Sequence, residues 1–362
     1  MKVVDLVGAM EDIAPTRLAA PWDNVGLLVG DPAAVLSRVL LAIDLTRPVL
    51  EEAIAVRAEA VVAYHPPIFA AQKRFVAGSV AFEAARAGLA VYSPHTALDV
   101  AAGGTNDVLA DAVGMKERGA LRRAEAREAQ VKLVTFVPAE RVDAVGEALF
   151  AAGAGHIGKY SSCSFRMAGT GTFFGEEGAD PAVGKAGRLE SVAEVRLETV
   201  VPLARIDEVV KALRAAHSYE EPPFDLLRLM PPPESRGFGC VGAVDAATVA
   251  DIVARLKAAL GVEHVLVAGD TGRSVERVAV CAGSGGELVD DAIASGAQLF
   301  VTGELRHHDA LRVVEAGLVA VCTRHSTSER AALVPLRARL SALLPGVAVT
   351  CSTVDREPLT FT

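Results

Sequence analysis

The chain has 362 residues, of which 51% are hydrophobic and 22% charged, and its formal net charge is −9. This length suffices for two or three domains, and the composition is that of an ordinary globular protein. The acidic balance argues against a general nucleic-acid binder, because such proteins gain affinity from lysine and arginine. A local basic groove remains compatible with it.

The N-terminal stretch MKVVDLVGAMEDIAP is too acidic, and its apolar part too short, for a signal peptide. No apolar run reaches the roughly 18 residues of a membrane span. We therefore expect a cytoplasmic protein with no membrane partner. The five cysteines are widely spaced and form no CxxC pair, so neither a disulfide framework nor a cysteine zinc site is expected.

Helix and strand patterns alternate along the first third of the chain. They predict a helix over 3–14, a strand over 39–43, a helix over 48–57, and apolar runs at 61–62 and 89–92. Between the first two elements, Asp23 and Asn24 precede Gly26 and predict a turn before a short strand. This loop also holds Trp22, the single tryptophan. It is either a structural turn or part of a site lining.

Polar residues follow both apolar runs. The first run leads into Tyr64 and His65, which stand before two prolines, and the second leads into His95 and Asp99. Proline cannot donate a ladder hydrogen bond, so the first strand must end at His65. In open α/β sheets, such strand ends border the functional crevice. A GG turn then precedes a helix that Thr105 or Asn106 is expected to cap.

The residue pattern changes in the middle of the chain. Residues 116–129 are highly charged and lack a core face, which predicts a domain boundary. Residues 131–229 show strand, helix, strand, strand, helix and strand patterns, which indicate a ferredoxin-like α+β module of ordinary domain size. Pro231–Pro233 are expected to close this module. From 237 onward, α/β alternation returns, so the module is predicted to be inserted between two similar halves of one α/β domain.

The C-terminal half repeats the arrangement of strand ends. The apolar run 299–302 leads to Glu304 and His308, and the run 318–322 leads to His325 and Glu329. Ser326 or Thr327 is expected to cap a helix that would place His325 and Glu329 one turn apart on the same side. His, Asp and Glu are ligands for zinc and other divalent metals. Two such clusters meeting in space would hold a pair of ions, although the spacing fits no short metal motif.

These residues carry a resemblance to a known family. The stretches PWDNVGLLVGD, AYHPPIF, SPHTALDVAAGGTND, GAGHIGKYSSCSF, HSYEEPPFD, GELRHHDAL and RHSTSE together resemble the Nif-three-like family, whose bacterial members are often labelled GTP cyclohydrolase 1 type 2 homologue. The resemblance covers nearly the whole chain. It implies a three-layer α/β/α core of two similar halves (1–128 and 233–362) and a PII-like or CutA-like insertion (129–232). It also implies a dinuclear metal site and a homohexamer.

The same resemblance implies a ligand set. His65 matches the second histidine of the family's HHP motif, Asp99 the aspartate after HT, and His325 and Glu329 the terminal HxxxE. Tyr64 departs from the pattern, because it stands where many members have the first histidine. Tyrosine is a poor ligand at neutral pH, so a second ion is expected to be weak, absent or completed by water. His95 and His308 are the nearest residues to compensate.

Two functions remain open at this point. One is a metal-dependent hydrolase acting on a nucleotide-like or phosphorylated small molecule, using one or two ions, with zinc favoured over iron or manganese. In this hypothesis Glu304 or His308 carries the proton. The other is a non-catalytic metal-binding scaffold or metal-handling protein whose inserted module senses a ligand. Turnover of nucleotides by metal-loaded protein distinguishes the two hypotheses, since family resemblance carries fold better than substrate.

Overall fold

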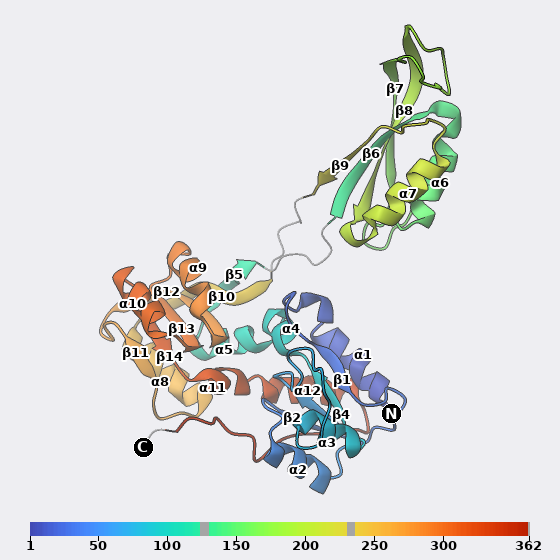
Figure 1. Ribbon diagram of the computed structural model, residues 1–362. Helices are drawn as coiled ribbons and strands as arrows, with labels where there is room; N and C mark the ends of the chain where they lie inside the picture. Colours follow the sequence, from blue (N-terminus) through green and yellow to red (C-terminus); the bar gives the residue numbers. More distant parts are fainter. Residues whose placement is uncertain (124–129, 230–235, 361–362) are drawn as a thin grey trace. The chain divides into compact units, whose positions relative to one another are not determined.

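The computed structural model describes residues 1–123, 130–229 and 236–360. The chain divides into two compact units: Met1–Glu125 with Pro233–Thr362, and Ala126–Pro232. We call the first the core unit and the second the inserted unit, and Figure 1 shows the elements of each. Within the described residues, no helix is long and apolar enough to cross a membrane.

The core unit holds two sheets. The strands of the first, in spatial order, are β1 (Gly26–Val29), β4 (Ala90–Ser93), β3 (Ala60–Ala63), β2 (Arg38–Ala42) and β15 (Ala348–Cys351). The strands of the second are β11 (Leu266–Ala268), β14 (Val319–Cys322), β13 (Leu299–Glu304), β12 (Ser274–Ser284), β10 (Gly237–Thr248) and β5 (Lys116–Arg123). In the first sheet, β2, β3 and β4 are parallel, and β1 pairs with β4 as an antiparallel edge strand. In the second sheet, β12, β13 and β14 are parallel in the same way, and β11 pairs with β14 as an antiparallel edge strand. This shared order confirms the predicted pair of similar halves.

Helices cover both faces of each sheet. On the first sheet, α1 (Val3–Ile13) and α12 (Leu333–Leu343) cover one face, and α2 (Arg47–Ala55) and α3 (Val80–Arg86) cover the other. On the second sheet, α5 (Thr105–Val113) and α8 (Val249–Leu260) cover one face, and α9 (Val289–Ala294) and α10 (His307–Glu315) the other. Burial on both faces explains why the parallel strands are continuous apolar runs. The three-layer α/β/α prediction is confirmed.

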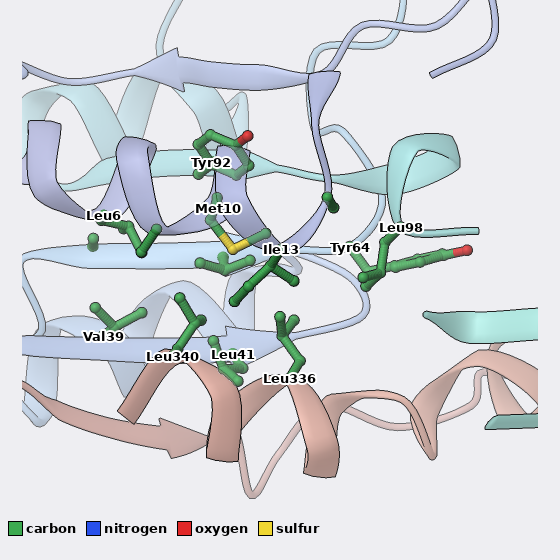
Figure 2. Packing of buried hydrophobic residues seen from close by; sticks show 14 of the residues in the cluster. Leu6, Met10, Ile13, Val39, Leu41, Tyr64, Tyr92, Leu98, Leu336 and Leu340 are labelled. Carbon is green, nitrogen blue, oxygen red and sulfur yellow. The ribbon is translucent and has the colours of Figure 1, made fainter. Parts of the chain in front are cut away.

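The core of the first half shows the alternation of strand side chains directly. Val39 and Leu41 of β2 point toward one face, where they meet α1 and α12, whereas Leu40 and Ala42 point to the opposite face. Figure 2 shows Met10 of α1 and Leu340 of α12 in this one cluster, on the same face of the sheet as Val39 and Leu41. The two halves also exchange elements, because β15 from the C-terminus completes the first sheet and β5 completes the second.

The inserted unit is a single four-stranded antiparallel sheet with two helices on one face. Its strand order is β7 (Ser164–Phe174), β8 (Leu189–Pro202), β6 (Gln130–Pro138) and β9 (Phe224–Arg228). The helices α6 (Val142–Ala151) and α7 (Ile206–Ala216) pack on Leu133, Leu197 and Val201. The chain order βαββαβ with this strand order is the ferredoxin-like arrangement that the sequence predicts.

Some local predictions were wrong. The first eight residues of the charged stretch 116–129 form the edge strand β5, which pairs with β10 and tolerates charge because one side of an edge strand meets solvent. Strand β10 itself was missed. Gly104, not Thr105 or Asn106, is the N-cap of α5, and Arg324, not Ser326 or Thr327, precedes the first residue of the helix that begins at His325. Residues 124–129 and Pro231–Pro233 lie outside the described residues.

Candidate metal centre

His65 stands at the carboxyl end of β3, where its backbone N–H donates to the carbonyl of Ile43 at 2.9 Å. Its ring Nδ1 lies 2.9 Å from Oδ1 of Asp44, which follows the neighbouring strand β2. This contact orients the ring so that Nε2 faces Glu329. Burial lowers the pKa of His65, but the neighbouring carboxylates of Asp44 and Glu329 outweigh it and raise the pKa to about 10. The surroundings of the ring therefore favour a positive charge.

His325 and Glu329 come from the short helix α11 (His325–Arg330), which follows β14. As predicted, one helical turn brings them together, with Nε2 of His325 lying 3.4 Å from Oε1 of Glu329. The residue before this helix, Arg324, has φ +75°, a left-handed conformation that is uncommon for a residue with a side chain. Backbone strain of this kind gathers at functional sites. Nδ1 of His325 lies 3.1 Å from Oε1 of Glu304.

These three side chains converge, although 264 positions separate His65 from Glu329. One ligand atom from each of His65, His325 and Glu329 lies within 4.8 Å of the others. Nε2 of His65 is 3.4 Å from Oε2 of Glu329, and the His65 and His325 rings are 5.3 Å apart between centroids. We call these three residues the metal cluster.

The metal cluster contains buried polar atoms without partners. Nε2 of His65 and Oε2 of Glu329 are both buried and have no hydrogen-bond partner among the described residues. Glu329 is only 3% exposed, and a buried carboxylate is costly unless a cation or hydrogen bonds compensate it. Two imidazole nitrogens and a carboxylate are a donor set that zinc and related divalent ions accept. These residues therefore fit a divalent metal ion.

Two glycines make room for the metal cluster. Gly283, at the end of β12, has φ +69°, and a Cβ there would lie 2.7 Å from Oε1 of Glu329. A Cβ at Gly303 in β13 would lie 2.4 Å from the carbonyl of Gly283. Both positions thus require glycine, because α11 approaches the strand ends closely. The backbone forms one wall of the site.

Tyr64 and Asp99 form a separate pair beside the metal cluster. The Tyr64 hydroxyl donates to Oδ1 of Asp99 at 2.5 Å. Burial and the nearby carboxylates hold the pKa of Tyr64 well above its usual value, so the hydroxyl keeps its proton. Burial also raises the pKa of Asp99 to about 6. In this structure Tyr64 acts as a hydrogen-bond donor to Asp99, and Asp99 lies outside the set of three ligand atoms that come together.

His95 lies next to both the metal cluster and the pair of Tyr64 and Asp99. It begins the helix α4 (His95–Val100), and its ring centroid is 5.4 Å from that of His65 and 5.6 Å from that of Tyr64. Its Nδ1 is 2.8 Å from Oδ1 of Asp23. Of the two interpretations of the Trp22 loop, the structure favours the site lining, since Asp23 orients His95. His95 and Asp99 are spaced like His325 and Glu329, which is a further mark of the two similar halves.

The two residues predicted as proton carriers lie in different settings. Glu304 is at the end of β13, half-exposed, and in contact with His325. His308 is exposed on α10 and has a ring contact with His307, 5.4 Å between centroids. Within the described chain, no hydrogen bond or ion pair joins His308 to the metal cluster. Sequence reasoning missed the orienting role of Asp44, which stands after a buried strand just as His65 does.

Comparison with known proteins places the chain in a family. A family model described as Duf34/NIF3 (NGG1p interacting factor 3) matches residues 1–358. A Mycobacterium tuberculosis protein named "GTP cyclohydrolase 1 type 2 homolog" is 39% identical over 371 aligned residues, which cover 99% of this chain and 96% of that protein.

Solved structures of similar proteins support the same family assignment. A Bacillus cereus protein related to NIF3 has a TM-score of 0.66 at 33% identity, and a Staphylococcus aureus protein has a TM-score of 0.78 at 26% identity. Each alignment covers 100% of this chain and 99% of the other. The resemblance inferred from the sequence is thereby confirmed, and the chain belongs to the Duf34/NIF3 family.

Proposed function

We propose that this protein is a divalent-metal-dependent hydrolase acting on a nucleotide-like substrate. The observation that carries the proposal is the metal cluster, in which a buried histidine nitrogen and a buried carboxylate oxygen face each other without hydrogen-bond partners. Three protein ligands are fewer than a closed structural zinc site uses, and catalytic sites keep a position open for water or substrate. A divalent ion held here would supply Lewis acidity toward water and toward developing negative charge.

The chain's own residues have assigned roles in this proposal. His65, His325 and Glu329 bind the ion, and Asp99 with Tyr64 or His95 completes any second site. Asp44 and Glu304 hold the Nδ1 protons of His65 and His325, which keeps each Nε2 available as a ligand. His95, whose Nδ1 is held by Asp23, is the imidazole placed for proton transfer. His308 remains a candidate proton carrier only if the substrate reaches α10.

An exposed aromatic pair supports a planar substrate group. Trp22 is 61% exposed and Phe69 is 56% exposed. Their ring centroids are 6.0 Å apart and lie 6.2 Å and 6.5 Å from that of His95. Stacking of a nucleobase on such rings contributes about 1–3 kcal/mol. The name of the Mycobacterium tuberculosis relative also points to a guanine nucleotide.

Turnover by metal-loaded protein tests the proposal. Apoprotein would be loaded with zinc, manganese or iron and incubated with GTP, other nucleotides and phosphoesters, followed by product identification. We expect turnover by the parent, loss of turnover in His325→Ala, and retention in the control His264→Ala, which removes an exposed histidine outside the metal cluster. If no substrate turns over above the His325→Ala background, the metal-binding scaffold replaces the hydrolase.

The finer expectations belong to the same proposal. They are zinc as the resident ion, a homohexamer, a cytoplasmic location and a PII-like inserted module. Metal analysis of protein purified without added metal, light scattering of the full chain and cell fractionation test the first three. None of them is needed for the turnover experiment.

A further inference from the structure

The inserted unit contains a large cavity that the proposed function does not use. Its volume is about 690 Å³, which is within the range of small-molecule sites. It lies on the face of the sheet opposite α6 and α7. Residues directly opposite each other on neighbouring strands point to the same face of a sheet. Arg196 of β8 is opposite Met167 of β7 and Phe136 of β6, and all three line the cavity.

Glycines form the floor of this cavity. Gly169 pairs with Glu194, and a Cβ at Gly169 would meet no heavy atom within 4 Å. A Cβ at Gly171 would lie 2.1 Å from Oε2 of Glu194, so this glycine lets the carboxylate lie over the strand. Glycine weakens a strand interior and often marks a place where a ligand or another group approaches closely.

The cavity lining carries more negative than positive side chains. Four carboxylates, those of Asp180, Glu194, Glu220 and Glu221, share the cavity with one guanidinium, that of Arg196. Arg196 is already engaged, because its Nε donates to Glu198 at 2.7 Å and its guanidinium lies over the Phe136 ring at 5.9 Å. Glu194 accepts the Tyr219 hydroxyl on Oε1 at 2.6 Å. Its Oε2 has no hydrogen-bond donor among the described residues.

We propose that this cavity binds a small organic amine with an apolar body. The protonated amine is placed at Oε2 of Glu194, and the apolar body contacts Phe136, Met167 and Phe173. A charge-assisted hydrogen bond to a half-buried carboxylate is among the stronger polar contacts, and aromatic walls attract cations. An anionic ligand would face the carboxylates of Asp180, Glu194 and Glu220, while Arg196 is already paired with Glu198 and Glu221 is paired with Arg214.

Matched probes test the charge that the cavity selects. Isothermal titration of the full-length protein would compare phenethylamine, tryptamine and agmatine with 2-phenylethanol and 3-phenylpropanoate. We expect at least one amine to bind at least tenfold more tightly than the neutral and anionic probes. Glu194→Gln should weaken that amine by about tenfold or more, because it removes a charged acceptor.

A cavity-filling variant supplies the second readout. Gly169→Leu places a side chain in open space on a strand and should abolish amine binding while the thermal unfolding curve is kept. Gly119→Leu is its matched control, since Gly119 also lies in a strand with no atom within 4 Å of a Cβ. The proposal is overturned if no amine outcompetes its neutral analogue. It is also overturned if Gly169→Leu leaves amine binding intact, or if that variant changes the oligomeric state, which would assign the cavity to a second copy of the chain.

Discussion

The core unit and the inserted unit differ in the kind of sheet that carries their polar groups. In the core unit, parallel strands are buried on both faces, and the charged and imidazole side chains of the site stand at strand ends, as His65 and Glu304 do. In the inserted unit, helices cover one face of an antiparallel sheet, and the other face carries Glu194 and Arg196 in mid-strand. Sheet type therefore decides where each unit can hold a ligand. A change in one unit should therefore leave the ligand of the other unit bound.

Removing the inserted unit should have the largest effect. Register places Arg123 of β5 directly opposite Gly237 of β10, so a short Gly/Ser loop can replace the residues between them. We expect the shortened protein to bind divalent metal at the parent's stoichiometry and to lose all amine binding. Metal analysis and titration measure the two properties. Loss of both folding and metal would show that the inserted unit is integral to the core unit.

The reciprocal change is His325→Ala combined with Glu329→Ala. It removes two of the three ligand atoms of the metal cluster. Loss of an outer-shell partner alone costs about tenfold to 100-fold in metal affinity, so the loss here should be larger. Metal analysis should find no bound ion, while amine titration should match the parent. Unchanged metal content in the double variant would contradict the ligand assignment.

Asp44→Ala tests orientation rather than ligation. Asp44 holds Nδ1 of His65 at 2.9 Å, and without it the ring loses its fixed tautomer. We expect metal affinity to fall by about tenfold to 100-fold. Asp44→Asn keeps an acceptor oxygen and should fall between Asp44→Ala and the parent in a competition titration with a chelator. Equal affinities for all three proteins would remove Asp44 from the site.

Tyr64→His tests whether the neighbouring pair limits the second ion. The variant exchanges the Tyr64 hydroxyl donor for an imidazole, which is the better neutral ligand near pH 7. A two-site titration should show tighter binding of a second ion, with the first ion unaffected. Tyr64→Phe removes the hydroxyl without adding a ligand, and it should not gain the second ion. The idea fails if Tyr64→His and the parent bind the second ion equally.

The smallest expected effect concerns pH and the inserted unit. Nε2 of buried His217 bonds the Phe136 carbonyl at 3.0 Å, and its Nδ1 accepts the Tyr219 N–H at 3.0 Å. Burial lowers the pKa of His217, so the unfolded chain binds more protons below pH ~6.5. Stability is therefore full above that pH and declines as the pH falls through it. Thermal unfolding from pH 7.5 to 5 should show the decline, and His217→Gln, which does not titrate, should reduce it.

Local patterns in the sequence predicted most of the elements and one contact of the metal cluster. Apolar runs located the parallel strands because burial on both faces leaves few polar positions within them. The spacing of His325 and Glu329 predicted their contact, since one helical turn separates them. Strands β10 and β5 were not predicted. Glycines in β10 and charged residues in β5 hide the alternation of apolar and polar positions that marks a strand.

Tertiary structure decided which polar residues from distant segments meet. The approach of Glu329 to His65 depends on α11 packing against Gly283 and Gly303, and no local pattern specifies this long-range contact. The same packing left Asp99 with Tyr64 and gave Asp44 its orienting role. Strand register in the inserted unit likewise brought Glu194 opposite Gly169. Sequence period determines which face a side chain takes, whereas its partner depends on register and packing between distant segments.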